Sequence, residues 1–249
     1  MSHEPIIQLQ NVGVCYTRRT GMMRNAKFWA LHDVSFDLRH GETLGVVGHN
    51  GAGKSTLLRL LAGIIAPDRG EVVCRTDRVS LLSLQAGFVP HLTGRQNAIL
   101  SGILMGLSRR EVLACMNDII EFSELGEFID EPVRTYSSGM RARLGFATAF
   151  QANPDILLVD EVLGVGDTGF REKSTIAMKQ KIASNKTVVI VTHNPESIIN
   201  LCDRMVWVHH GVTRAIGEPR ELLWQYQQSF NRADSRPTML READKISGL

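Results

Sequence analysis

Short apolar runs and longer stretches with helical spacing alternate along this chain. Apolar runs of strand length occupy residues 43–47, 153–161, 187–193 and 205–211. The first run leads into a stretch with helical spacing at residues 56–62. Continuous apolar strands that alternate with helices are typical of a largely parallel sheet with helices on its faces. The pattern therefore predicts an α/β fold.

Further helices and a polar tail are predicted later in the chain. Residues 107–125 repeat apolar positions at helical spacing and begin with Ser108 and Glu111, the spacing of a capping box. A short helix is predicted at residues 219–230. The polar residues 231–249 have weak periodicity and contain a proline, so we expect one domain of residues 1–230 and a flexible tail.

A glycine-rich stretch at residues 45–63 reads GVVGHNGAGKSTLLRLLAG. Gly48, Gly53, Lys54 and Ser55 match the P-loop pattern GxxxxGK[ST], between a predicted strand and a predicted helix. The glycines let backbone N–H groups surround an anion, and the new helix adds its positive end. The match predicts Lys54 on the β- and γ-phosphates of a nucleotide and the Ser55 hydroxyl on Mg²⁺. A turn with an incidental lysine does not account for strand, loop and helix together.

Two later strands end in polar residues. The run at residues 153–161 ends in Asp160 and Glu161, and the next run ends at His193 before the helix-start pair Asn194 and Pro195. The carboxyl ends of parallel strands face the ligand crevice of an α/β sheet. The pattern predicts Asp160 in the Mg²⁺ sphere and Glu161 as the acceptor of a proton from an attacking water. It places His193 at the same edge.

The segment EPVRTYSSGMRARLGFATAF, residues 131–150, distinguishes between classes of P-loop protein. Ser137, Ser138 and Gly139 open a predicted helix, which is either a further phosphate-binding device or a plain N-cap. With the motifs above it, this segment resembles the nucleotide-binding subunit of ABC transporters. The motifs stand in the family's order over roughly the first nine-tenths of the chain.

This resemblance implies a fold and a site. The fold is a P-loop NTPase ABC cassette with a RecA-like core, an antiparallel β-subdomain and a helical signature subdomain at about residues 95–150. Two chains enclose ATP and Mg²⁺, and the catalytic residues are Glu161, His193 and Lys54. The residues implied to contact the nucleotide are Tyr16, Gly48, His49, Asn50, Gly51, Ala52, Gly53, Lys54, Ser55, Thr56, Gln85, Ser137, Ser138, Gly139, Met140 and Asp167. Those implied to hold Mg²⁺ are Ser55, Gln85 and Asp160.

Two of these residues, Tyr16 and Gln85, have more than one interpretation. Tyr16 matches the aromatic residue that stacks on adenine in this family, but a core or edge tyrosine explains it as well. Gln85 is the candidate for the glutamine that couples Mg²⁺ to the membrane partner, at a position where the family varies. Gln96 stands where a glutamate is usual, in TGRQN, which removes any acidic contact expected there.

Residues 28–36, 81–97 and 157–167 resemble one branch of the family, which exports completed polysaccharides such as O-antigens, capsules and teichoic acids on lipid carriers. This implies a homodimer, a transmembrane permease subunit, a lipid-linked polysaccharide as cargo and a place at the cytoplasmic face of the inner membrane, with no nucleic acid. Residues 107–125 either form part of the groove for a permease helix or pack only on their own domain. Alternatives are the ATPase of a lipid, drug or nutrient ABC transporter, or a soluble ABC ATPase acting on ribosomes or DNA.

Composition adds few constraints. A net charge of +2, 43% hydrophobic and 22% charged residues are ordinary for a globular protein. The four cysteines lack metal-like spacing, which favours reduced thiols. The first ten residues lack the apolar core of a signal peptide, and the uncharged stretch 98–107 is too short to span a bilayer. We expect another chain to supply any membrane part.

A basic segment at residues 16–29 has two interpretations. It contains Arg18, Arg19, Arg24 and Lys27 and almost no acid. A solvated hairpin between the first two strands is the simpler one. The other places the basic side chains against anionic lipid or a carrier pyrophosphate.

Overall fold

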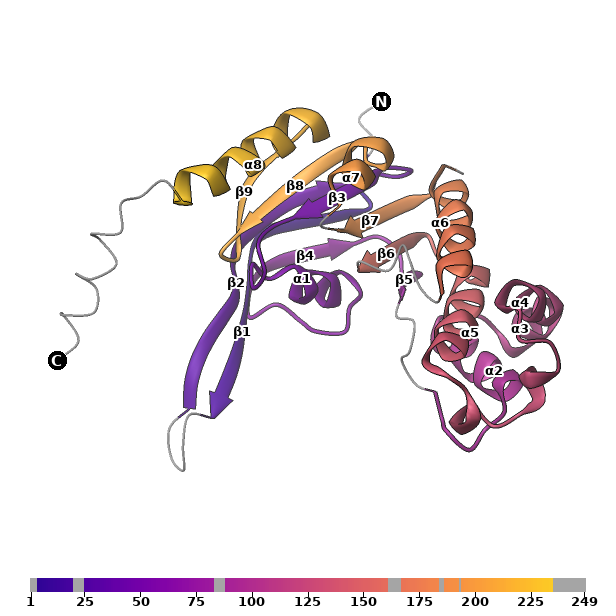
Figure 1. The fold of residues 1–249 in the computed structure, drawn as a ribbon. Helices are drawn as coiled ribbons and strands as arrows, with labels where there is room; N and C mark the ends of the chain where they lie inside the picture. The colour runs from indigo at the N-terminus through magenta and orange to yellow at the C-terminus, as the bar shows by residue number, and fades with distance from the viewer. Residues whose placement is uncertain are drawn as a thin grey trace.

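The computed structural model describes residues 4–19, 25–82, 88–160, 167–183, 186–192 and 194–234. In this part of the chain, nine strands form one curled sheet in the order β4-β1-β2-β9-β8-β3-β7-β6-β5 (Figure 1). The strands are β1 Ile7–Arg19, β2 Asn25–Leu38, β3 Thr43–Val47, β4 Arg69–Cys74, β5 Val79–Leu82, β6 Ile156–Asp160, β7 Thr187–Val191, β8 Arg204–His209 and β9 Val212–Gly217. The helices are α1 Lys54–Leu61, α2 Gly94–Leu104, α3 Arg109–Ala114, α4 Met116–Ser123, α5 Ser138–Gln151, α6 Thr168–Ala183, α7 Pro195–Leu201 and α8 Pro219–Asp234, with 3₁₀ turns η1 Gly126–Asp130 and η2 Val133–Thr135.

The sheet has a parallel half and an antiparallel half. Strands β5, β6, β7, β3 and β8 are parallel neighbours, whereas β1 pairs antiparallel with β2 and β4. All five residues of β3 and of β7 are buried, because these central strands are covered on both faces. The predicted α/β fold is confirmed.

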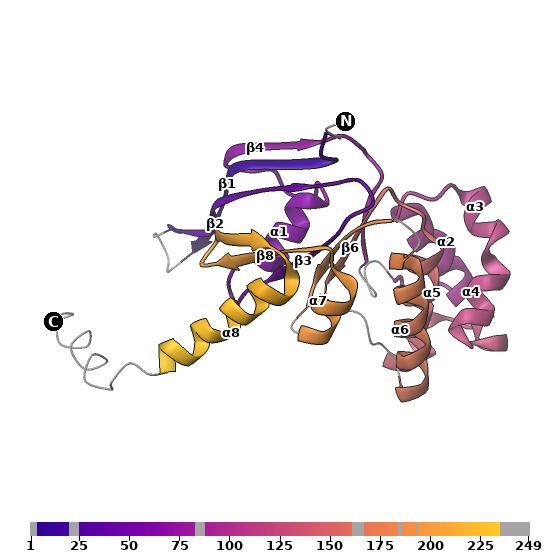
Figure 2. The same ribbon diagram turned by 90° about the horizontal axis from the view of Figure 1, so that it is seen from above.

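Helices cover both faces of the parallel half. Helix α1 lies inside the curl of the sheet, where Leu57 and Leu58 pack against β1, β2 and β3. Helices α7 and α8 lie on the opposite face, around Trp207 and Leu222 (Figure 2). The phosphate-loop helix is thus held between the two halves of the sheet.

Helices α2 to α5 with η1 and η2, here called the helical region, form a group beside the sheet (Figure 2). They share a core that includes Val112, Met116, Ile119 and Leu144. The helical stretch predicted at residues 107–125 and its capping box are confirmed. The stretch forms two helices that meet at Cys115, whose φ and ψ are −97° and 12°. The bend lets the apolar residues of both helices reach the same core.

Strand β1 and helix α8, near the two ends of the chain, bear on the predictions for the hairpin and for the tail. Strand β1 continues to Arg19, where it pairs with Asn25, so the predicted hairpin is confirmed for the described residues. Its paired strands extend away from the rest of the sheet (Figure 1). Side chains 18–25 lie outside the described residues, and so does the tail from residue 235. Helix α8 runs through Asp234 and includes the first four residues that were expected in the tail.

Candidate functional site

The glycine loop after β3 is fixed by its backbone. Gly51 and Gly53 have φ values of 81° and 102°, in the left-handed region that favours glycine. A Cβ at Gly53 would lie 2.5 Å from the Ala30 carbonyl oxygen, and one at Gly48 would lie 2.4 Å from that of Val208. The loop is therefore pressed against β2 and β8, and two of its glycines leave no room for a side chain.

Lys54, the first residue of α1, lies along this loop. Its side chain is 8% exposed, and its ammonium donates hydrogen bonds to the carbonyls of Gly48 at 2.8 Å and His49 at 3.2 Å. Thr56 is buried and Ser55 is exposed. Since a helix N-terminus attracts anions, the positive end of α1 and the Lys54 ammonium act together on one position.

A cleft of about 550 Å³ opens over this loop. It is lined by Tyr16, Phe28, Ala30, Asn50, Gly51, Gly53, Lys54, Ser55, Thr56 and Asp160. Tyr16 and Phe28 are paired residues of β1 and β2, with exposed fractions of 37% and 59%. Exposed aromatic faces beside a phosphate cradle suit a nucleotide base. Tyr16 is therefore not a core residue, whereas an edge position agrees with its exposure. Phe28, which lines the cleft beside Tyr16, was not singled out from the sequence.

Asp160 reaches the cleft from the end of β6. It is half-buried and pairs with Val191 of β7, so the ends of these two strands lie side by side. Glu161 and His193 follow directly after Asp160 and Thr192 but lie outside the described residues, and so does Gln85.

Residues 136–140, here called the signature segment, lie on the helical region and do not line the cleft. Ser137 is the N-cap of α5, where its hydroxyl accepts a hydrogen bond from the Met140 N–H at 3.1 Å. Ser137 and Ser138 are exposed, and Gly139 and Met140 are half-buried. Of the predicted site residues that the structure describes, these four, together with Asp167, Gly48, His49 and Ala52, are not among the residues that line the cleft.

A buried tyrosine holds the signature segment in place. The Tyr136 hydroxyl donates to the Phe128 carbonyl at 2.5 Å, and a Cβ at Gly94 would lie 2.2 Å from that hydroxyl. Burial, with the charges of Asp130 and Glu131, raises the pKa of Tyr136 to about 12. Tyr136 therefore stays a neutral donor.

Asp167 begins α6. Its carboxylate accepts a hydrogen bond from the Phe170 N–H at 3.0 Å, which lowers its pKa below the usual value. The geometry of Asp167 in this chain is that of a helix cap.

The site combines a glycine loop between a buried strand and a helix, a lysine along the loop, a carboxylate at the end of β6 and an aromatic rim. These features define a P-loop nucleotide-binding protein. Residues 31–164 match the family described as ABC transporter. The O-antigen export system ATP-binding protein RfbB of Klebsiella pneumoniae is 45% identical over 84% of this chain and 85% of its own length. The chain belongs to the ABC transporter family, and it is an ATPase of that family.

Other relatives agree with this assignment. The teichoic acids export ATP-binding protein TagH of Lactococcus lactis is 46% identical over 81% of this chain, which spans 43% of that protein. The dimeric, post-hydrolysis structure of the ATP-binding cassette MJ0796 bound to ADP and Pi is 26% identical, with a TM-score of 0.68 over 86% of this chain and 99% of that one. The predicted cassette fold is confirmed. Among the described residues, no helix is long and apolar enough to cross a membrane.

Proposed function

We propose that this chain is the ATP-hydrolysing subunit of a transporter that exports a lipid-linked polysaccharide across the cytoplasmic membrane. The observation that carries the proposal is the similarity, at 45% identity along most of both chains, to a protein named for O-antigen export. The TagH name, for teichoic acid export, supports the same class of cargo. We infer that the chain sits at the cytoplasmic face of that membrane through a permease subunit.

The volume and the lining of the cleft support ATP as its ligand. Loop N–H groups and Lys54 would hold the β- and γ-phosphates, and the Tyr16 ring would stack on adenine, beside Phe28. Ser55, Asp160 and Gln85 would hold Mg²⁺, which when bound neutralises charge on the phosphates. Ser55 and Asp160 line the same cleft, which supports this assignment.

Water activation is assigned to the two residues beyond the strand ends. Glu161 would accept a proton from the attacking water, and His193 would contact the γ-phosphate. The support is their place in the chain, directly after Asp160 and Thr192, on the paired strands β6 and β7.

A second copy of the chain would complete each site. Ser138 and Gly139 open α5 away from the cleft of their own chain, so their N–H groups are available to a phosphate held by a partner. The similarity to a structure titled as a dimeric cassette supports this arrangement. ATP would then favour association, because it binds the dimer better than the separate chains.

The test uses Glu161→Gln in cells that carry no other copy. We expect polysaccharide to disappear from the surface and accumulate inside on its lipid carrier, because hydrolysis fails while ATP binding survives. The purified variant should dimerise in ATP, as measured by light scattering. Glu71→Gln, at an exposed position of β4, is the matched control and should behave like the parent.

The two measurements separate the cargo from the mechanism. Normal surface polysaccharide with an ATP-trapped dimer would overturn the cargo assignment alone. A variant that stays monomeric in ATP would overturn the dimeric mechanism.

A further inference from the structure

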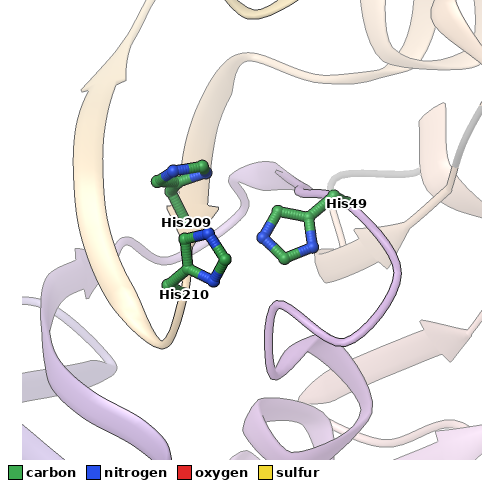
Figure 3. Close-up of side chains that lie close together, drawn as sticks. All are labelled: His49, His209 and His210. Atoms are coloured by element: carbon green, nitrogen blue, oxygen red, sulfur yellow. The ribbon is translucent and has the colours of Figure 1, made fainter. Parts of the chain in front are cut away.

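One residue of the phosphate loop faces away from the nucleotide cleft. The His49 side chain extends from the loop toward the rings of His209, the last residue of β8, and His210, in the turn to β9 (Figure 3). The ring centroid of His49 lies 5.3 Å from that of His209 and 4.5 Å from that of His210. The ring centroids of His209 and His210 lie 4.4 Å apart. One ring nitrogen of each histidine lies within 4.8 Å of the others.

The backbone, and not the rings, brings these residues together. The Gly211 N–H donates to the Ala52 carbonyl at 3.1 Å, and the Gly211 carbonyl accepts from the His32 N–H at 2.7 Å. The turn is fixed further by His210, whose φ is 49°. The backbone positions of the three histidines are therefore set by contacts that involve no imidazole.

The His49 ring has one satisfied nitrogen and one unsatisfied nitrogen. Its Nδ1 lies 2.7 Å from the Asn50 carbonyl oxygen. Because a carbonyl oxygen only accepts hydrogen bonds, Nδ1 carries the proton that bonds to it. Its Nε2 is buried and has no hydrogen-bond partner. A carbonyl on one imidazole nitrogen and a free lone pair on the other is the arrangement of metal-ligating histidines. If the three rings only packed against one another, the buried Nε2 would have no hydrogen-bond partner, which costs free energy of folding.

We propose that His49, His209 and His210 form a binding site for a first-row transition-metal dication, of the class of Zn²⁺ and Ni²⁺. Three neutral imidazoles suit these borderline ions and leave a fourth position for water. With bonds of about 2.0–2.1 Å, the ligand nitrogens of a tetrahedral site are about 3.3 Å apart. The exposed His209 and His210 rings close this distance by side-chain rotation, whereas His49 stays in place.

The site is separate from the proposed Mg²⁺ position. None of the three histidines lines the nucleotide cleft, and their ligand atoms are imidazole nitrogens, whereas Mg²⁺ prefers oxygen. A metal ion here links the phosphate loop to the β8–β9 turn. It therefore stabilises the loop conformation that holds Lys54 next to the Gly48 and His49 carbonyls.

The test measures Zn²⁺ and Ni²⁺ binding to the full chain, prepared without a histidine tag, by calorimetry and by competition with a chromophoric chelator. We expect one ion per chain. His209→Asn and His210→Asn should each weaken binding at least about a hundredfold. Asparagine is chosen at His210 because it tolerates a positive φ. The matched controls His40→Asn and His91→Asn change exposed histidines elsewhere and should bind as the parent does.

A second measurement follows the loop itself. Zn²⁺ should raise the Tm of the parent by several degrees and slow amide exchange in peptides that contain residues 48–53, with neither effect in His210→Asn. Unchanged ATP binding by His210→Asn establishes that this variant is folded. Binding that is absent, or that His40→Asn weakens as much as His210→Asn does, would overturn the proposal. Metal binding without slower exchange in the loop would overturn the link to the phosphate loop.

Discussion

The phosphate loop and the helical region are built by different kinds of contact. The loop depends on residues far away in the chain, because Gly53 packs on Ala30 and Gly48 packs on Val208. Its shape comes from positive φ values and from the close approach of β2 and β8 to the loop. It has that shape only when β2, β3 and β8 are already assembled.

The helical region combines a shared apolar core with side-chain bonds between residues close in the chain. Thr93 and Gln96 form a reciprocal capping box at the start of α2, and Ser108 and Glu111 form another at the start of α3. Asn97 has an exposed fraction of 0% and bonds to Val89, Leu92 and Thr93. Short-range side-chain bonds thus set the helix starts and the turn before α2, whereas the shape of the phosphate loop depends on contacts with distant strands. Substitutions in the loop should therefore lower the free energy of unfolding through altered packing, and those in the helical region through the loss of single hydrogen bonds.

The largest effect on stability is expected at Gly53. Gly53→Ala should lower the free energy of unfolding by roughly 2–5 kcal/mol, because it combines a strained φ with a Cβ placed against the Ala30 carbonyl. Gly51→Ala is the matched control: its φ is also positive, but its Cβ meets nothing within 4 Å. It should cost about 1–2 kcal/mol in urea unfolding. Equal losses for the two variants would show that distant packing does not set the loop.

The next effect is expected at Asn97, in the helical region. Asn97→Ala should cost about 2–3 kcal/mol, because it leaves the partly buried N–H of Val89 without its acceptor. It also removes one of the donors to the carbonyls of Val89, Leu92 and Thr93, which keep their backbone partners. Asn117→Ala, at an exposed position of α4, should change stability little. Urea unfolding measures both. A neutral Asn97→Ala would contradict the view that local side-chain bonds order this region.

Tyr136→Phe should have a smaller effect. It removes one hydroxyl and leaves the Phe128 carbonyl without this donor, for a loss of about 1–2 kcal/mol of unfolding free energy. Tyr16→Phe loses a hydroxyl at the exposed rim of the cleft and should leave stability unchanged. If thermal unfolding ranks the two variants in the opposite order, the role given to Tyr136 is wrong.

The smallest effect, a gain, is expected at Gln96. The Gln96 amide oxygen accepts from the Thr93 N–H at 3.0 Å, so it fills the acceptor role of a capping-box glutamate without its charge. Gln96→Glu should stabilise the chain by about 0.5 kcal/mol at low salt, through the positive end of α2. The gain should shrink in 1 M salt. A loss at low salt would show that the charge meets something other than the helix end.

Motifs that span only a few residues could be predicted before the structure was known. The P-loop motif, the strand that ends in Asp160, and the caps of α3 and α5 follow from spacing, because each motif spans a few neighbouring residues. The shape of the loop itself depends on β2 and β8. These motifs were enough to predict the cassette fold and the residues that line most of the cleft.

Which of these motifs meet in space depends on the folded sheet and could not be predicted. The helix break at Cys115, the aromatic pair Tyr16 and Phe28, and the approach of His49 to the β8–β9 turn depend on strand register and core packing. The β3–β8 pairing brings residues about 160 positions apart into contact, and the register of Val47 against Trp207 places the turn on the loop. No local pattern encodes such a contact, because its energy depends on surfaces that exist only after the sheet has formed.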